Sequence, residues 1–126
     1  KPKSIFFDEL TSYKHNFYLI GWFDGAFDFG RSAEKLLHTP DKDKGMGTYN
    51  GAKYSDSEID SQLASSASIV DLAEREKALQ AINRKSVEDV AWIPLHYQQD
   101  LFAVVKGKDI KFKPRSDRWI VVKEIQ

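Results

Sequence analysis

The sequence contains no cysteine among its 126 residues. A disulfide framework, a thiolate zinc site and a cysteine nucleophile are therefore excluded, although the cellular compartment is not identified by this absence. An excess of charge of one sign is also lacking, because 19 basic residues balance 19 acidic ones. That balance gives no electrostatic footprint for a nucleic-acid partner or a membrane surface.

Long hydrophobic runs are missing as well, since no apolar stretch approaches the ~20 residues that span a bilayer. Apolar residues make up 41% of the chain and charged residues 30%, a balance typical of a globular protein. The length indicates one domain or one lobe of something larger. The chain begins Lys1-Pro2-Lys3, so it is interpreted as a mature protein or an excised fragment.

Short apolar runs predict several β-strands. Residues 5–7 and 17–23 are rich in aromatic side chains, and the second run is almost continuously apolar, as in a strand buried on both faces. Further β-like runs occupy residues 92–97, 101–105 and 120–122, and Ile110 and Phe112 alternate with lysines after a turn at residues 106–109. Pro94 cannot donate to a ladder, so its strand is expected at an edge, a start or a bulge.

Helix start signals predict three helices. Ser32 is a plausible N-cap for a short helix that runs through Leu37 and stops before Pro40. Residues 39–57 then form a long loop rich in Gly, Pro, Asp, Asn and Ser.

Two capping boxes follow this loop. Ser55 with Glu58 begins a helix in which Ile59, Leu63, Ala67 and Val70 recur at helical spacing. Asp71 with Glu74 opens the longest helix, roughly residues 72–90, whose apolar face carries Leu79, Ile82, Ser86 and Val90.

The local chemistry is concentrated in the segment LIGWFDGAFDFG, residues 19–30. Asp24 and Asp28 allow two interpretations: a glycosidase-like acid/base pair, or loop carboxylates that bond their own backbone, which is much the commoner case. Trp22 stands where an expected buried strand gives way to a loop, a usual place for a pocket wall.

Metal and cofactor chemistry has no support in the sequence. Residues 41–52 begin like a calcium loop, but Gly45 occupies its fifth position and Ala52 its twelfth, where calcium loops place ligands. The three histidines are scattered without metal-ligand spacing, so neither a metal nor a cofactor is expected.

Several segments, in their order along the chain, carry a family resemblance. They are FYLIGW at residues 17–22, Asn50, Tyr54-Ser55-Asp56, Asp60, Asp71 with Arg75, Ile93-Pro94-Leu95 and KPRSDRW at residues 113–119. The chain resembles the C-terminal part of the family-five extracytoplasmic solute-binding proteins, which are the dipeptide- and oligopeptide-binding proteins of bacterial ABC importers.

The resemblance implies an α/β fold: the C-terminal lobe fragment of a two-lobed periplasmic-binding-protein-like fold, with a mixed sheet and about three helices. Residues 1–98 would belong to one ligand-binding lobe, and residues 99–126 would return to the other lobe of a much longer protein. The implied partners are a peptide or other small solute and a membrane-embedded ABC permease. Non-physiological self-association is a further expectation, because strands in residues 100–126 would lack their normal neighbours. The implied location is periplasmic or extracytoplasmic, with a membrane anchor if the protein is a lipoprotein.

The resemblance also implies binding residues. Trp22 matches a cleft tryptophan, and the backbone at Phe23 follows where relatives bond an extended peptide. Several relatives receive the peptide's α-ammonium group on an Asp three residues after the tryptophan, and here that position is Gly25. Asp24 lies one residue earlier, Asp28 matches a second acidic position, and Gln98 matches a position near the ligand at the hinge.

Three alternatives remain open from the sequence, and one of them is a purely structural interaction domain that binds no small ligand at Trp22. The same family includes binders of metal chelates, oligosaccharides and glutathione-like peptides, so the solute could be one of these. A small hydrolase using Asp24 and Asp28 is the alternative from another class; the main expectation is that the protein is not an enzyme.

Overall fold

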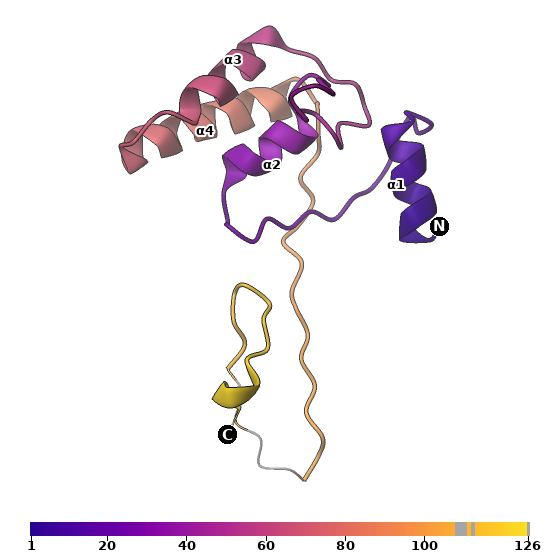
Figure 1. Ribbon diagram of the computed structural model, residues 1–126, viewed down its shortest axis with the longest axis vertical. Coiled ribbons are helices and arrows are strands. Elements are labelled where there is room, and N and C mark those ends of the chain that lie inside the picture. Colours follow the sequence, from indigo (N-terminus) through magenta and orange to yellow (C-terminus); the bar gives the residue numbers. More distant parts are fainter. Residues whose placement is uncertain (108–110, 112, 126) are drawn as a thin grey trace. The chain divides into compact units, whose positions relative to one another are not determined.

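A computed structural model describes residues 1–107, 111 and 113–125 of the chain (Figure 1). The chain divides into two units, Lys1–Pro94 and Leu95–Gln126. The first unit holds four α-helices: α1 (Lys3–Thr11), α2 (Phe29–Leu36), α3 (Ser57–Ser66) and α4 (Leu72–Glu88). Among the described residues of the second unit there is one short 3-10 helix, η1 (Val122–Glu124).

The expectation of an α/β lobe with a mixed sheet is wrong. The described residues form helices and no strand; their only ladder element is an isolated antiparallel bridge between Asp41 and Met46. Apolar runs such as residues 17–23 and 101–105 are compatible with strands, but a strand also needs a neighbour that accepts and donates its backbone hydrogen bonds. The residues described here supply no such neighbour, so the runs stay outside regular structure.

Residues 5–7 lie within helix α1 rather than in a strand. Three apolar residues are too few to distinguish the two periodicities, and the helix is set by the longer pattern around them. Phe6 and Leu10 are four residues apart and share one face, on which Leu10 is fully buried. The Phe6 N–H donates to the Pro2 carbonyl at 3.0 Å, which begins the first turn.

Helices α3 and α4 confirm the two longer helix predictions, with corrections at their ends. The Asp71 carboxylate accepts the Glu74 N–H at 2.9 Å, which confirms the expected cap of α4. The cap of α3 is Asp56 rather than Ser55, and that of α2 is Asp28 rather than Ser32. Val70, expected on the buried face, lies beyond the end of α3 and is 92% exposed.

The core lies where α3 packs against α2 and α4. Its buried apolar side chains come from all three helices: Ala33, Leu37, Ile59, Leu63 and Ile82. Ser66 and Ser86 are buried beside them, and each hydroxyl donates to a carbonyl of its own helix at 2.8 Å, so neither hydroxyl is left unsatisfied.

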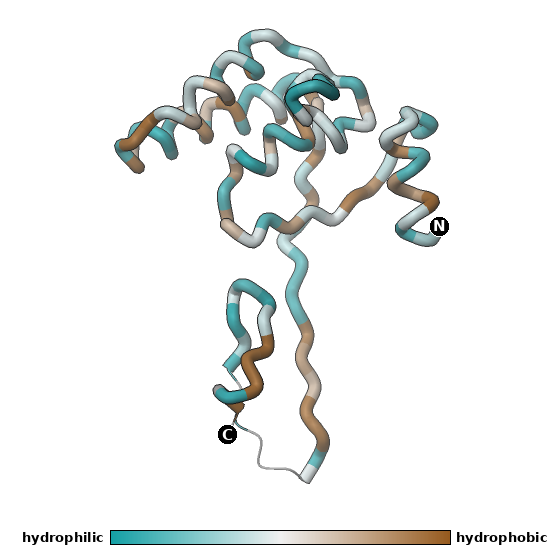
Figure 2. The backbone as a smooth tube through the Cα atoms, viewed as in Figure 1, coloured by the Kyte–Doolittle hydropathy of each residue, from teal (hydrophilic) through white to brown (hydrophobic). Residues whose placement is uncertain are grey.

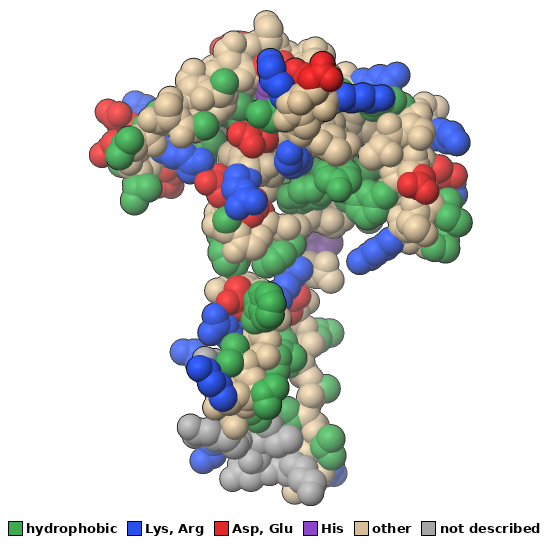
Figure 3. Space-filling view, in the orientation of Figure 1, with side chains coloured by type: hydrophobic (Ala, Val, Ile, Leu, Met, Phe, Trp, Pro, Cys, Tyr) green, Lys and Arg blue, Asp and Glu red, His purple; other side chains and the backbone are tan. Residues whose placement is uncertain are grey.

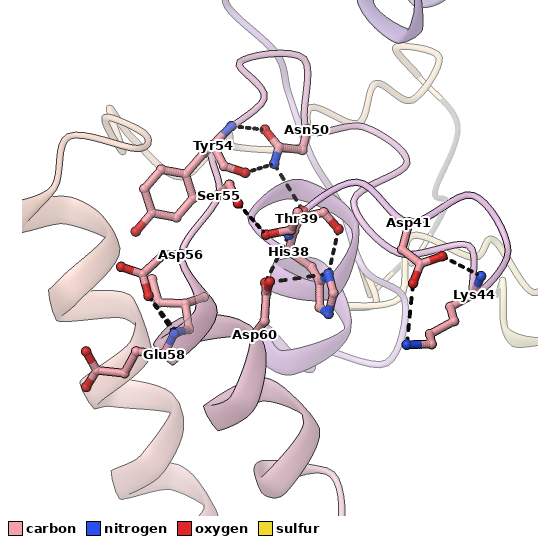
Figure 4. Close-up of polar contacts among 11 residues, drawn as sticks. His38, Thr39, Asp41, Lys44, Asn50, Tyr54, Ser55, Asp56, Glu58 and Asp60 are labelled. Atoms are coloured by element: carbon pink, nitrogen blue, oxygen red, sulfur yellow. Dashed lines mark hydrogen bonds and ion pairs between the residues drawn. The ribbon is translucent and has the colours of Figure 1, made fainter.

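Asn50 organises the long loop between α2 and α3 (Figure 4). Its side chain is only 2% exposed. The amide nitrogen donates to the His38 carbonyl at 3.0 Å and to the Tyr54 carbonyl at 2.8 Å, while the amide oxygen accepts the Tyr54 N–H at 3.1 Å. One amide therefore joins the beginning and the end of the loop.

A charged cluster joins the start of α3 to the end of α4. The Lys85 ammonium lies 3.0 Å from Asp56 and 3.1 Å from Asp89, and the Tyr54 hydroxyl donates to Asp89 at 2.7 Å. The pKa of the Asp56 carboxyl is lowered below its ordinary value of 3.8, mainly by the hydrogen bond from the Ile59 N–H and secondly by the bond from Lys85. The pKa of the Asp89 carboxyl is also lowered, mainly by the hydrogen bond from the Tyr54 hydroxyl and secondly by the bond from Lys85.

Val90 ends helix α4 in a left-handed conformation, with φ of 56°. The Val90 N–H bonds to the Val87 carbonyl at 3.0 Å and the Ala91 N–H to the Ser86 carbonyl at 2.9 Å, which is a Schellman motif. That position normally carries glycine, because a β-branched side chain is strained there. Val90 is also 66% exposed, so the expectation that it lies on the buried face of the helix is wrong.

Substituting Val90→Gly is expected to raise the free energy of unfolding by about 1 kcal/mol, because it relieves this strain and removes little packing. Urea unfolding of both proteins measures the difference. Val87→Gly, inside the same helix, is the matched control and is expected to lower stability by about 1 kcal/mol. A loss of stability in Val90→Gly would contradict the strain argument.

The second unit exposes most of its large apolar side chains. Tyr97, Leu101 and Trp119 are among the most exposed residues described. The β-like runs at 92–97 and 101–105 carry no ladder bonds among the described residues, and the run at 120–122 leads into η1. Ile110, Phe112 and part of the expected turn at 106–109 lie outside the described residues. Among the helices that are described, none combines the length and apolar character needed to cross a membrane.

Candidate functional site

The loop before α2 is shaped by its own aspartate. Asp24 Oδ1 accepts the Ala26 N–H at 2.8 Å, and the Asp24 carbonyl accepts the Phe27 N–H at 3.0 Å. This is the backbone-bonding role that is common for aspartate in a tight turn. Phe27 adopts a left-handed φ of 54°, and its ring lies edge-on to that of Phe23 at 5.9 Å.

An open cavity of about 330 Å³ borders this loop. Its lining contains four of the residues expected at a binding site, together with three residues of α2 and one of the following loop: Trp22, Phe23, Asp24, Gly25, Arg31, Glu34, Lys35 and Tyr49. The structure thus brings the aromatic-acidic loop together with a mixed set of charges on one face of a helix.

Tyr49 reaches this cavity because its loop bonds to the end of α2. The Gly47 N–H donates to the Glu34 carbonyl at 2.8 Å, and the Tyr49 N–H donates to the Lys35 carbonyl at 2.9 Å. These carbonyls belong to the last turn of the helix and have no partner within it. At Gly47, φ is 58° and a Cβ would meet Pro40 backbone atoms within 2.9 Å, so the close approach requires glycine.

Aromatic rings form the wall of the cavity. The Trp22 and Tyr49 rings lie 5.2 Å apart, and Tyr49 in turn contacts the ring of Phe7 at 5.6 Å. Figure 3 shows hydrophobic side chains gathered between the positions of α1 and α2. Because the Tyr49 ring contacts both Trp22 and Phe7 of α1, helix α1 packs against the aromatic wall of the cavity.

The cavity carries two acidic and two basic groups. Arg31 lies 3.7 Å from Asp24, and the Lys35 ammonium donates to the Gly45 carbonyl at 2.8 Å. The carboxylate of Glu34 is half-buried and bonds to no side chain among the described residues. Glu34 is therefore a carboxylate acceptor at the cavity that remains available to a ligand cation.

Asp28 is held away from such a role by two structural contacts. Its carboxylate accepts the Gly30 N–H at 2.8 Å as the N-cap of α2, and its two oxygens lie 3.1 and 2.9 Å from Arg75 Nη2. Arg75 Nε also donates to the Ser66 carbonyl at 3.2 Å. Asp28 thus links α2 to α3 and α4, and it does not line the cavity. A hydrolytic pair would need the carboxylate that this ion pair occupies.

Gln98, expected near the ligand at the hinge, belongs to the second unit, where it is exposed.

The calcium-like stretch at residues 41–52 is a loop held by its own hydrogen bonds, because the Asp41 carboxylate accepts the N–H groups of Asp43 and Lys44 at 3.1 Å. Within the described part of the chain, no three acidic or histidine side chains are grouped to hold a metal ion.

Sequence reasoning missed Glu34, Tyr49 and the two α2 cations. The helical spacing of Arg31, Glu34 and Lys35 places them on one side of α2 and was available in the sequence. The position of Tyr49 was not, since it depends on the loop bonding back to the helix end.

Comparisons of the chain with models of protein families, with curated proteins and with solved structures find no match.

Proposed function

We propose that this chain is part of the solute-binding component of a peptide-type ABC importer, acting outside the cytoplasm. In this role it captures a short peptide by lobe closure and delivers it to a membrane permease, without covalent chemistry. The observation that supports the proposal is the cavity beside Trp22, in which aromatic rings, two carboxylates and two cations converge. Its mixed charge suits a zwitterion, and its aromatic wall suits the apolar parts of a peptide.

A peptide's α-ammonium group loses water when it enters such a cavity and needs a carboxylate in exchange. Asp24 and Glu34 both line the cavity, but Asp24 already shapes its own turn and lies near Arg31. Glu34 bonds to no other described side chain. Glu34 is accordingly the proposed receptor of the ammonium group, and Asp24 is a supporting charge.

Lobe closure sets the expected affinity of the chain by itself. Ligands stabilise the closed state by contacting both lobes, so one lobe alone supplies only part of the contacts. We expect the isolated chain to bind a short peptide with a Kd of about 1 mM or weaker. Tight binding to the isolated chain would contradict capture by closure.

The site is tested by NMR titration of the chain with trialanine and with N-acetyl-trialanine, following the Trp22 indole and Gly25 amide signals. Trialanine is expected to bind more tightly, because only it carries the ammonium group.

Trp22→Ala is expected to weaken trialanine binding at least about tenfold, whereas Trp119→Ala, in the exposed second unit, leaves it unchanged. Glu34→Gln is expected to abolish the preference for trialanine. Equal shifts from both peptides in the unmodified chain would contradict an amine-binding site.

A further inference from the structure

The segment between α1 and α2 has strand-like character but no strand partner. Residues 18–24 run without a turn or bend, and no backbone–backbone hydrogen bond joins residues 17–22 to any other described residue. In Figure 2 this stretch, which leaves α1 toward α2, is markedly hydrophobic. A run of free N–H and C=O groups on an apolar segment is a template for another extended chain.

The two faces of the segment are differently used. Tyr18 packs its ring 6.4 Å from that of Phe6, and it also lies against Gly51, where an ideal Cβ would stand 3.2 Å from Tyr18 Cε1. The alternate residues point outward: Phe17 is 86% exposed and Leu19 is 73% exposed. One face is therefore anchored to the unit, and the other presents apolar side chains to a partner.

The segment also lacks the features that protect exposed edges. Residues 17–23 contain no charged residue and no proline. Gly21 has open space where a side chain would stand, since no atom lies within 4 Å of its ideal Cβ position. A bulky side chain from a partner can therefore lie over Gly21.

We propose that a second copy of this chain pairs with the segment as an antiparallel strand, on a two-fold axis at Leu19. In this register Leu19 faces its own copy, and the exposed ring of Phe17 covers Gly21 of the other chain. This register is self-complementary, because the exposed Phe17 ring of each copy meets the open space at Gly21 of the other, and this fit selects a second copy as the occupant.

Sedimentation over a range of protein concentrations tests the association. The chain is expected to dimerise, and Leu19→Lys is expected to leave it monomeric, because two ammonium groups would face each other on the axis. Val70→Lys is the matched control, since Val70 is 92% exposed and lies between α3 and α4. A dimer that persists in Leu19→Lys, or a wild-type chain that stays monomeric at every concentration, overturns the proposal.

Cross-linking tests the register, and the absence of native cysteine makes it specific. Facing residues of an antiparallel pair have Cα atoms about 4.5–5.5 Å apart, within disulfide range. Leu19→Cys is expected to oxidise to a disulfide dimer much faster than Val70→Cys. Equal rates would overturn the register. Protection of the residue 18–22 amides only when an extended peptide is added would overturn the second copy in favour of a peptide partner.

Discussion

Replacing Asn50 with Ala is expected to lower the free energy of unfolding by about 3 kcal/mol. The substitution removes all three hydrogen bonds of the side chain and leaves the His38 carbonyl, the Tyr54 carbonyl and the Tyr54 N–H without partners. Each buried polar group left unsatisfied costs about 1–3 kcal/mol. A loss of this size is a large fraction of the stability of a unit of this length. Urea unfolding, with hydrogen exchange at the Tyr54 amide, measures it.

Asn83→Ala is the matched control, because Asn83 is exposed in α4 and its side chain forms no hydrogen bond among the described residues. Its stability is expected to stay within about 0.5 kcal/mol of the wild type. Asn50→Asp should not rescue Asn50→Ala, since a carboxylate cannot donate to the two carbonyls that the amide nitrogen holds. If Asn50→Ala changed stability no more than Asn83→Ala, the loop would be held by other contacts.

The sequence predicted those helices whose signals are local. In α4, the Asp71 cap and the apolar spacing of Leu79 and Ile82 fall within one element, so they could be recognised without knowledge of the fold. The strand predictions required more than local pattern. An almost continuous apolar run such as residues 17–23 indicates a strand buried on both faces, but a sheet forms only where a second strand lies alongside.

The candidate site was predictable to the same extent. Trp22 through Gly25 are consecutive in the sequence, so their grouping needed no tertiary information. Arg75 and Asp28 are 47 residues apart, and no sequence pattern near Asp28 indicates that the two side chains form an ion pair. The site is thus made from a contiguous loop, which sequence analysis finds, and from supporting contacts across helices, which it does not.

The same supporting contacts connect stability with the proposed site. The loop after α2 positions Tyr49 through bonds to the last carbonyls of the helix. The next residue, Asn50, is held in place by the bond from its amide nitrogen to the His38 carbonyl. A change at Asn50 should therefore loosen the aromatic wall beside Trp22 as well as destabilise the unit. Effects on ligand binding must accordingly be measured where the variant is still folded.

Substituting Arg75→Met is expected to lower the free energy of unfolding by about 2 kcal/mol. Arg75 binds both oxygens of Asp28 and the Ser66 carbonyl, and the two charged side chains are about one-quarter exposed, 25% and 23%. This value lies between the small contribution of a surface pair and the larger cost of breaking a buried one. Met retains the aliphatic packing of the stem, so the loss reports the polar contacts.

A double-mutant cycle with Asp28→Asn isolates the ion pair, because asparagine remains a good N-cap for α2 while losing the charge. We expect a coupling energy of about 1–2 kcal/mol between the two positions. Additive effects would show that Arg75 acts through Ser66 alone.

The cycle also separates the roles of the two loop aspartates. Asp28→Asn is expected to lower stability and leave trialanine affinity unchanged, because Asp28 is bound to Arg75 and does not line the cavity. Asp24→Asn is expected to do the reverse: its amide oxygen can still accept the Ala26 N–H, but the negative charge at the cavity is lost. NMR titration and urea unfolding of the same two variants measure both quantities. Weakened binding in Asp28→Asn at full folding would instead place Asp28 at the ligand and contradict its assignment as a purely structural residue.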